Sequence, residues 1–542
     1  MTRSVARFIY NKARLFFSKK LRSNDMSDVL NRLKQFRATL YSLFPYRRDA
    51  LFNLLDALTS RGHESKSIVE LSEAKVFERQ YSSITDAIAD GLPKAPFDRI
   101  EHAVFEATKV PGTGHIFFID CTSNPRPWAR TLTEKSIVHA PNPAPGNKPI
   151  CVGHQYSVLA MSPNENEASK KHWLIPLSIE RIKRNEKGNE RGMQQIADQI
   201  AALGLDDDLS ISVGDSLYGS EHCRSIASNN KNLVHVFRIS NSRNLFYQPT
   251  ADELATKGVG RKKTYGSKMD LSDPTTYKEP DSFVVLDGAS KKKSLVIEIS
   301  QWNNLLIRGS REFPSARYPV NLARVIVKNE QGESVFKRPL WIGVMGRRRH
   351  EVDSHRTYQI YRQRYDIEHF FRFGKQKLLL DSYQTPETEH EALWWKFAPL
   401  AYIQLYLASH VRHLVPKPWE RYLPAYKVPL EEHSSQVKTP SQTQRIFENI
   451  LEQVGTPAKS SVTRGKPLGR IAGDKPTARE HSPIHFKGHK NTNCSNTDIN
   501  ADPEKAAINP EVVLIDKLLN DIKAKLKLAK ITPQAFAEKL IL

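Results

Sequence analysis

The sequence contains few cysteines and no long apolar segment. Only four cysteines occur among 542 residues, and none lies in a Cys-x-x-Cys pair. This spacing argues against a disulfide framework or a structural zinc ribbon and favours a reducing compartment. No apolar run approaches the roughly 18 residues that a membrane-spanning helix requires. We therefore expect a cytoplasmic protein without a membrane partner.

Acidic residues are too few to balance the basic ones. The chain carries 81 Lys and Arg against 59 Asp and Glu, which gives a formal net charge of +22. Because basic side chains that contact nucleic acid release condensed counterions, this excess favours a nucleic-acid partner. Residues 1–25 form a basic N-terminal extension. It is compatible with a transit peptide, a DNA-binding arm or a translation start placed upstream of Met26.

The hydrophobic pattern changes from helical to strand-like near residue 113. Residues 26–112 have apolar residues at helical spacing and are expected to form a helical, DNA-binding domain. Residues 113–239 then predict three strands, a helix, a strand, a helix and a strand, with the first strand ending at Asp120 and the fourth at Asp215. This is the order of a ribonuclease H-like domain, an α/β fold with a mixed sheet flanked by helices.

The remaining segments interrupt and extend this domain. Residues 240–346 carry strand patterns between Gly- and Lys-rich stretches and predict a β-rich insertion, with a hairpin turn at residues 330–332. Residues 347–426 predict the helical second part of the core, and residues 427–455 a short helical segment. Residues 456–505 are polar and expected to be a disordered linker before a last helical segment, residues 506–542.

One helical stretch carries an unusual set of polar residues. Tyr361, Arg364, Glu368 and Lys375 project within roughly 60° of one another at about 100° per residue, so they share one helix face. A carboxylate between an arginine, a lysine and a phenol is poor packing surface. It suits a metal ion held beside phosphate groups, with the arginine able to contact phosphate through two N–H groups.

Glu368 needs further acids to hold two divalent cations. Asp120 and Asp215 end two different predicted strands at the carboxyl side of the sheet, where their side chains can converge. Three carboxylates are suited to two Mg²⁺ ions, for which Mn²⁺ is a possible substitute, because Mg²⁺ prefers oxygen ligands and substrate phosphates. Such a pair can support in-line displacement at phosphorus. We therefore predict that Asp120, Asp215 and Glu368 are both catalytic residues and metal ligands.

The spacing Tyr361-x2-Arg364-x3-Glu368-x6-Lys375 resembles the signature of bacterial insertion-sequence transposases of the DDE class. The resemblance covers roughly residues 100–415, and it includes the two strand-end aspartates and the β-rich insertion. It implies a protein that binds the terminal inverted repeats of its element, cleaves the ends with Mg²⁺ and joins 3′-hydroxyls to target DNA. It also implies a dimer or larger assembly on double-stranded DNA, in the bacterial nucleoid when bound. Trp341, near the end of the insertion, matches the tryptophan that stacks on a flipped base in related enzymes.

Two alternatives remain open at this stage. The run Gly214-Asp215-Ser216-Leu217 is typical of a family of serine esterases, in which Ser216 would act with His369 and Asp366. The absence of an oxyanion-hole block and the large positive charge disfavour this interpretation. The other alternative is a DNA-binding protein derived from a transposase that no longer catalyses a reaction.

Overall fold

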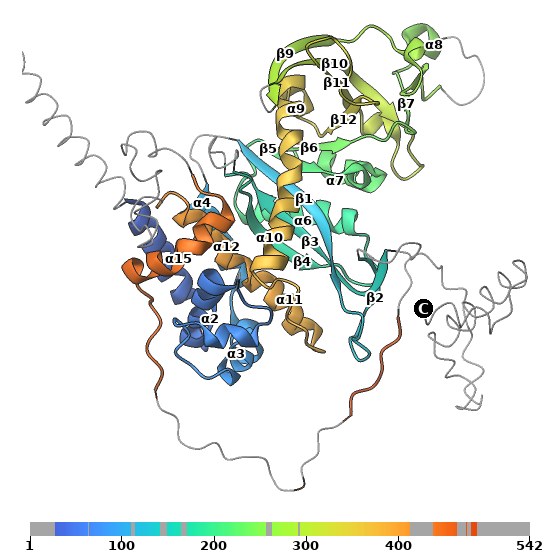
Figure 1. Ribbon diagram of the computed structural model, residues 1–542. Coiled ribbons are helices and arrows are strands. Elements are labelled where there is room, and N and C mark those ends of the chain that lie inside the picture. Colours follow the sequence, from blue (N-terminus) through green and yellow to red (C-terminus); the bar gives the residue numbers. More distant parts are fainter. Residues whose placement is uncertain are drawn as a thin grey trace, which may run out of the picture. The chain divides into compact units, whose positions relative to one another are not determined.

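The protein was analysed as a computed structural model, shown in Figure 1. All the residues that it describes belong to one compact unit, Met1–Lys487. The predicted N-terminal extension and the last helical segment lie outside the described residues, as does most of the predicted linker. The described residues are 28–62, 64–109, 114–140, 149–163, 171–255, 263–290, 293–411, 437–462, 473 and 478–484.

The N-terminal part is helical, as its apolar spacing predicts. A helix over residues 28–43 is followed by α2 (Arg48–Arg61), the short helices of residues 69–94 and α4 (Phe97–Thr108). The central helix α2 packs on α12 (Pro399–Ala408) and α15 (Pro440–Val454). Buried Arg37 joins these elements, because it contacts Asp56 of α2 and Gln404 of α12. The N-terminal helices therefore share a core with helices from the far end of the sequence.

A mixed sheet forms the centre of the molecule. Its first part has the order β4–β3–β1–β5–β6, in which β3 is antiparallel to both of its neighbours while β1, β5 and β6 are parallel. The helix α6 connects β4 to β5, and α7 connects β5 to β6. The bounds are β1 (His115–Pro125), β3 (Ile150–Met161), β4 (Ile175–Arg181), α6 (Gly188–Ala202), β5 (Ser210–Gly214), α7 (Glu221–Asn229) and β6 (Leu233–Arg238). A short β2 (Ser136–His139), which the sequence pattern did not predict, pairs with β3.

The predicted β-rich insertion continues this same sheet. Its last strand, β12 (Leu340–Met345), pairs with β6, and β11 (Val320–Lys328) and β10 (Lys293–Ile307) follow outward. The predicted hairpin turn is present, with Gly332 at a φ of +79° that favours glycine. The sheet has twelve strands in all. The insertion also contains β7 (Asn244–Phe246), the helix α8 (Ala251–Ala255), β8 (Lys268–Asp270) and β9 (Ser282–Ser290).

The chain after the insertion returns across the sheet as helices. The predicted helix over residues 355–380 consists of α9 (Ser354–Arg362), a 3₁₀ turn over Gln363–Tyr365 and α10 (Asp366–Lys377). In Figure 1 these elements form one nearly continuous rod that crosses β1. The apolar helix predicted next is instead two helices, α11 (Thr388–Phe397) and α12, which meet at Pro399. Proline begins α12 because it lacks the N–H that a helix interior requires.

Alternating residues of β1 face different helices. Ile119 and Cys121 lie against the glycines Gly192 and Gly188 at the start of α6. Phe118 belongs to the other core, with Ile360 of α9 and Ile367 of α10. The sheet is therefore covered by α6 on one face and by α9 and α10 on the other, as strand alternation requires.

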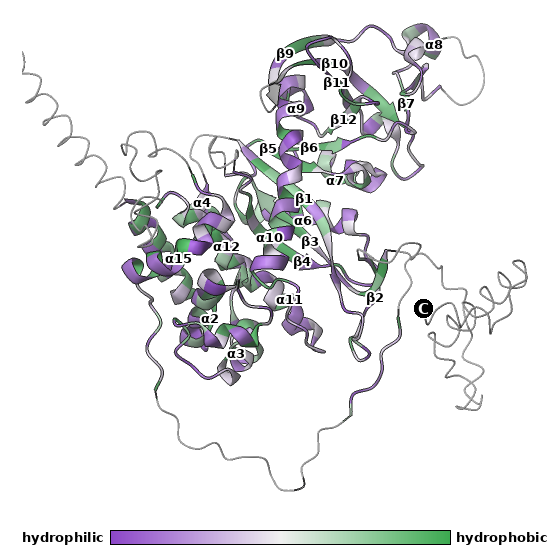
Figure 2. Cartoon of the chain, in the orientation of Figure 1, coloured by the Kyte–Doolittle hydropathy of each residue, from purple (hydrophilic) through white to green (hydrophobic). Residues whose placement is uncertain are grey.

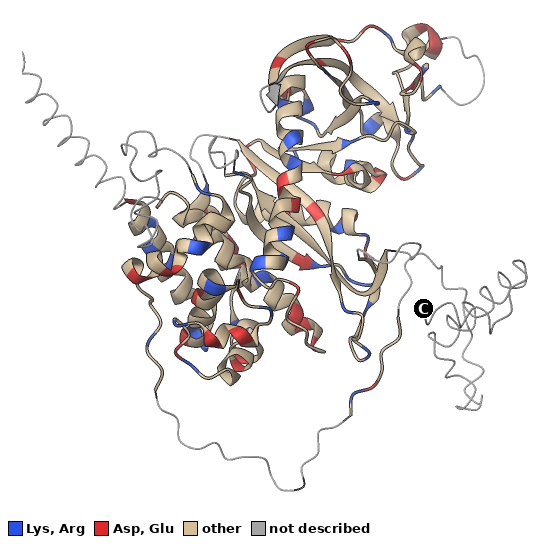
Figure 3. Cartoon of the chain, viewed as in Figure 1, with Lys and Arg blue, Asp and Glu red and all other residues tan. Residues whose placement is uncertain are grey.

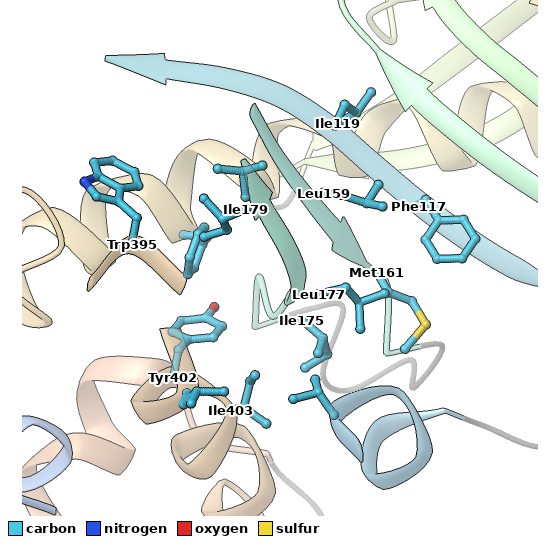
Figure 4. Close-up of a cluster of buried hydrophobic side chains, with 14 of the residues drawn as sticks. Phe117, Ile119, Leu159, Met161, Ile175, Leu177, Ile179, Trp395, Tyr402 and Ile403 are labelled. Carbon is cyan, nitrogen blue, oxygen red and sulfur yellow. The ribbon is translucent and has the colours of Figure 1, made fainter. Parts of the chain in front are cut away.

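Apolar side chains fill both interfaces of the sheet. Figure 2 shows hydrophobic strands at the centre, while α9 and α10 carry many hydrophilic residues. In Figure 4, side chains of β1, β3 and β4 gather beside Trp395 of α11 and Tyr402 and Ile403 of α12. Within the described ranges, no helix combines the length and the hydropathy that crossing a membrane would require.

Candidate active site

Asp120 lies on the face of β1 that α10 crosses. The expectation that β1 ends at Asp120 is wrong, because the strand continues to Pro125. Residues 121–125 stay in the sheet by pairing with β3, from Cys121 opposite Ser157 to Pro125 opposite Gly153. Pairing with β5, in contrast, ends at Phe118. Asp120 is therefore two residues past the point where β1 and β5 separate, and its side chain is one-fifth exposed.

Asp215 follows β5 directly and reaches the same level of the sheet. The parallel register pairs Phe118 with Val213, and Asp120 and Asp215 each follow that pair by two residues. Ile211 and Val213 belong to the core beneath α9 and α10, and alternation gives Asp215 the same orientation. Its Oδ1 accepts a hydrogen bond of 2.8 Å from the Leu217 N–H, which caps the 3₁₀ turn Ser216–Gly219. The strand expected to be the fourth and to end at Asp215 is β5, and it ends one residue earlier, at Gly214.

Arg364 and Glu368 approach the two aspartates from the helix. One guanidinium nitrogen of Arg364 donates to Asp120 Oδ2 at 3.2 Å, and the other donates to Glu368 Oε1 at 3.4 Å. A single positive group therefore bridges carboxylates from β1 and α10. Figure 3 shows acidic residues where α10 crosses β1, with basic residues further along the rod in both directions.

The environment of Asp120 disfavours its charged form. Burial raises the pKa of Asp120 to about 6, and the negative charges of Asp215 and Glu368 act in the same direction. The charge of Arg364 and a 2.8 Å hydrogen bond from the Cys121 N–H oppose this shift without cancelling it. The influence of Asp215 and Glu368 on Asp120 shows that the three predicted carboxylates occupy one neighbourhood. A further cation there would stabilise the ionised form of Asp120.

Tyr361 and Lys375 occupy the two ends of the same helix face. Tyr361 is half-buried beside Arg364, and burial raises the pKa of its phenol. Lys375 donates a 2.6 Å hydrogen bond to the backbone carbonyl of Ser123, three residues beyond Asp120 on β1. Burial lowers the pKa of this ammonium group, and the nearby Asp381 opposes that shift. Arg364, Glu368 and Lys375 therefore all face β1, as the sequence spacing predicts.

A basic groove of about 1020 Å³ begins beside Asp215 and extends along the insertion. Ser216 lines one part of it, and residues of β6, β11 and the segment before β12 line the rest. No Asp or Glu is among the described residues of its lining, and none of its five basic residues forms an ion pair with a described carboxylate. These basic residues are Arg238, Arg324, Lys337, Arg338 and Arg362.

Trp341 does not have the accessible position that base stacking requires. Its side chain is 0% exposed, on a strand between β6 and β11, and it packs with Tyr277 and Trp302. Trp302 is itself buried. This position contradicts the expected stacking role and identifies Trp341 as a core residue. The exposed aromatic ring of the groove is Phe336, which is 64% exposed.

The serine esterase interpretation is not supported by the positions of its residues. Asp366 and His369 lie with His172, and the ligand atoms of all three are within 4.8 Å of one another. Within the described residues, no hydrogen bond joins Ser216 to His369, and Ser216 lines the basic groove instead. Sequence reasoning missed His172, because it is distant in sequence and only folding brings it to α10.

The three carboxylates do not form an equally tight group. Among the described residues, the only three His, Cys, Asp or Glu side chains with ligand atoms all within 4.8 Å are His172, Asp366 and His369. Asp120 and Glu368 are instead connected through Arg364. The three side chains offer only oxygen ligands, which Mg²⁺ prefers. Burial, with the charges of Asp215 and Glu368, raises the pKa of Asp120, and a bound cation would oppose this shift.

Comparison with known protein families and with curated proteins finds no match for this chain. The site must therefore be interpreted from its own geometry. Asp120 on β1, Asp215 directly after β5, Glu368 on α10 and the neighbouring basic groove together form a candidate active site.

Proposed function

We propose that this protein is a DNA transposase of the DDE class, with Asp120, Asp215 and Glu368 as its catalytic carboxylates. The observation that carries the proposal is the parallel pairing of β1 and β5, because Asp120 and Asp215 each lie two residues beyond the last paired residues, Phe118 and Val213, while Arg364 connects Asp120 to Glu368. The resemblance of the Tyr361–Lys375 face to the transposase signature supports the same reaction.

The fold supports this proposal through the order of its strands. The order β4–β3–β1–β5–β6, with only β3 antiparallel to its neighbours on both sides, is the arrangement expected of a ribonuclease H-like core. The β-rich segment between Asp215 and Glu368 fits the insertion of the DDE group. We therefore propose that residues 115–238 and α10 together form such a core.

Asp120, Asp215 and Glu368 would hold Mg²⁺ through carboxylate oxygens. When bound, two such ions lower the pKa of an attacking water and neutralise charge on the leaving oxygen. The protein side chains supply the remaining positive charge. Arg364 already contacts two of the acids, and Lys375 lies along the same helix face, so both can contact phosphates of a DNA strand that lies across α10.

The proposed reaction has two displacements at phosphorus. In the first, the oxygen of a water molecule bonds to phosphorus at the element end, the P–O3′ bond breaks, and the released oxygen takes a proton to become a 3′-hydroxyl. In the second, the oxygen of this hydroxyl bonds to a phosphorus of target DNA and loses its proton, the P–O3′ bond of the target breaks, and the displaced 3′-oxygen takes up a proton. Neither step changes an oxidation state, so no redox cofactor is required.

The basic groove is the proposed path of the DNA beside the active site. None of its five basic residues forms an ion pair with a described carboxylate, so their charge is available to phosphates. Phe336 adds an exposed ring on which a base can stack. Because transposition joins two element ends, we also propose that two or more copies of the chain assemble on the terminal inverted repeats.

The decisive experiment uses a supercoiled plasmid that carries the gene with its flanking genomic DNA. Purified full-length protein with Mg²⁺ should release ends at the borders of the element, and sequencing should place short inverted repeats there. Glu368→Gln should reduce cleavage about 10³-fold, since removing even one charge-stabilising group costs 10²–10³ in rate at such sites. Binding to the same fragment in a gel-shift assay should remain.

Glu389→Gln is the matched control, because Glu389 is an exposed glutamate on α11. It should cleave as the unmodified protein does. Binding without cleavage by the unmodified protein would instead favour a silent DNA-binding protein. Equal cleavage by Glu368→Gln and the unmodified protein would overturn the proposed site.

A further inference from the structure

A second group of ligand-type side chains lies on α10. Asp366 and His369 are three residues apart and therefore share a helix face. His172 reaches them from the segment that precedes β4. One nitrogen or oxygen atom of each side chain lies within 4.8 Å of those of the other two. Three groups from two distant parts of the sequence thus converge without any role in the proposed cleavage.

The neighbours of His172 fix its position. Trp173 is fully buried, donates a 2.7 Å hydrogen bond from its indole to the Lys438 carbonyl, and packs on Tyr402. The His172 backbone has a φ of +60°, which is uncommon for a residue with a Cβ atom. The imidazole is thereby held against α10, although the backbone conformation is unfavourable.

The side chains of His172, Asp366 and His369 contact one another directly. His172 Nδ1 and Asp366 Oδ1 are 2.5 Å apart, so one proton lies between them. The His172 and His369 rings stack with centroids 4.4 Å apart and planes at 30°, and Tyr365 packs edge-on against His369. Asp366 is 8% exposed at its side chain, whereas His172 is 55% exposed. The group therefore has a buried carboxylate and a side that is open to solvent.

We propose that His172, Asp366 and His369 form a binding site for one transition-metal ion of the Zn²⁺ type, separate from the carboxylate site. Two imidazole nitrogens and one carboxylate oxygen are a ligand set that suits Zn²⁺ and poorly suits Mg²⁺. The ion would replace the proton between His172 Nδ1 and Asp366 Oδ1. The open side of His172 leaves room for a water molecule as the fourth ligand.

The charges around the group are compatible with a cation. Asp366 and Glu368 are the acidic groups that face His369, and Arg372 is the basic one. The ion would connect the segment before β4 to the first turn of α10. Glu368 lies between Asp366 and His369 in the sequence, so the ion would fix the part of the helix that presents this glutamate to Asp120. This metal site does not depend on the protein being a transposase.

The test measures metal binding by the full-length protein directly. Protein treated with EDTA is dialysed against Zn²⁺ in excess Mg²⁺, and the retained zinc is measured by elemental analysis. We expect one equivalent that Mg²⁺ does not displace, and a higher Tm with Zn²⁺ than without it. Co²⁺ in place of Zn²⁺ should give visible absorption from a site with nitrogen and oxygen ligands.

The variants separate this group from the other histidines. His172→Gln and Asp366→Asn should each lose the retained zinc and the Tm increase. Because the His172 side chain is 55% exposed, we expect His172→Gln to fold as the unmodified protein does without metal.

Two controls should keep the zinc. The first, His222→Gln, changes an exposed histidine whose ring contacts Phe313. The second, the double variant His485→Gln/His489→Gln, changes two histidines that are distant in sequence from the proposed ligands. Glu368→Gln should also keep the zinc while losing Mg²⁺-dependent cleavage, so failure of one proposal is distinguishable from failure of the other. No retained zinc in the unmodified protein, or unchanged zinc in His172→Gln, would overturn the proposed site.

Discussion

Two acidic residues near the same end of the sheet have opposite environments. Glu391 of α11 is fully buried, contacts Arg126, and accepts hydrogen bonds of 2.8 Å from His154 and Tyr156. Burial alone would raise its pKa, but these partners outweigh burial and lower it. Asp120 is more exposed, yet its pKa is raised to about 6 because Arg364 does not offset burial and the neighbouring acids.

This difference separates a structural acid from a functional one. Every oxygen of Glu391 has a partner, so its charge stabilises the connection of α11 to β3. Asp120 accepts one hydrogen bond at each oxygen, from the Cys121 N–H and from Arg364, but these do not offset burial and the neighbouring acids. Its charge therefore costs stability, and a bound cation would reduce that cost. Sites of this kind are common where a protein binds ligands, because function and stability compete there.

If Asp120 is a functional acid and Glu391 a structural one, the largest expected effect is a loss of DNA cleavage in the Asp120→Asn variant. Loss of one ligand oxygen's charge should reduce DNA cleavage about 10³-fold, because the amide is a poor partner for Mg²⁺. Tm should stay the same or rise, since the substitution removes a poorly compensated buried charge. Cleavage assays and thermal unfolding of the same preparation test this. A large fall in Tm would mean that Asp120 is a structural residue like Glu391.

The converse substitution should affect stability rather than chemistry. Glu391→Gln leaves the buried charge of Arg126 without its counter-ion, which should lower the free energy of unfolding by about 3 kcal/mol. Urea unfolding measures this, with exposed Glu389→Gln as a control near zero. Cleavage per folded molecule should be unchanged. If the folded variant is inactive, the network around Glu391 also positions the active site.

The raised pKa of Asp120 predicts a pH dependence of Mg²⁺ binding. Between its ordinary value near 3.8 and about 6, Asp120 binds a proton in the folded protein but not in the unfolded chain. Its contribution to stability therefore falls as the pH rises through this window. Below about pH 6, Mg²⁺ must displace that proton. The increase in Tm with Mg²⁺ should be larger at pH 8 than at pH 5.5, and Asp120→Asn should remove most of this difference.

The smallest effect concerns the groove. Replacing Lys337 and Arg338 with alanine removes two cations that have no described acidic partner. The slope of log affinity against log salt should become shallower by about 2, since each phosphate contact contributes roughly 0.9. Lys231→Ala/Arg311→Ala, which changes two exposed cations outside the groove lining, should leave the slope unchanged. Equal slopes for both double variants would place the DNA elsewhere.

The candidate site was predictable where it depends on local spacing. Arg364, Glu368 and Lys375 share a helix face because helical geometry fixes their directions, and the structure confirms this. Asp215 was also placed correctly, since an apolar run ends just before it.

What the sequence could not predict depends on pairing between distant segments. Residues 121–125 extend β1 only because β3 is available to bond them. Trp341 is buried because β12 lies between two strands, and His172 meets α10 through the path of the chain before β4. A short apolar run reveals a strand but not its neighbours, so the continuation of the insertion into the central sheet was equally beyond the sequence pattern.

The hydrogen bonds between β6 and β12 restrict how the insertion can be altered. Four residue pairs, from Ile342 with Arg238 to Met345 with His235, attach it along the length of β6. A lobe attached in this way cannot swing on a hinge without breaking the ladder, so it behaves as a fixed wall of the groove. Deleting the insertion would make β6 an exposed edge strand, and exposed edge strands pair with other chains and cause aggregation. We therefore expect variants that lack the insertion to aggregate, so deletion is a poor way to measure what the insertion contributes to function.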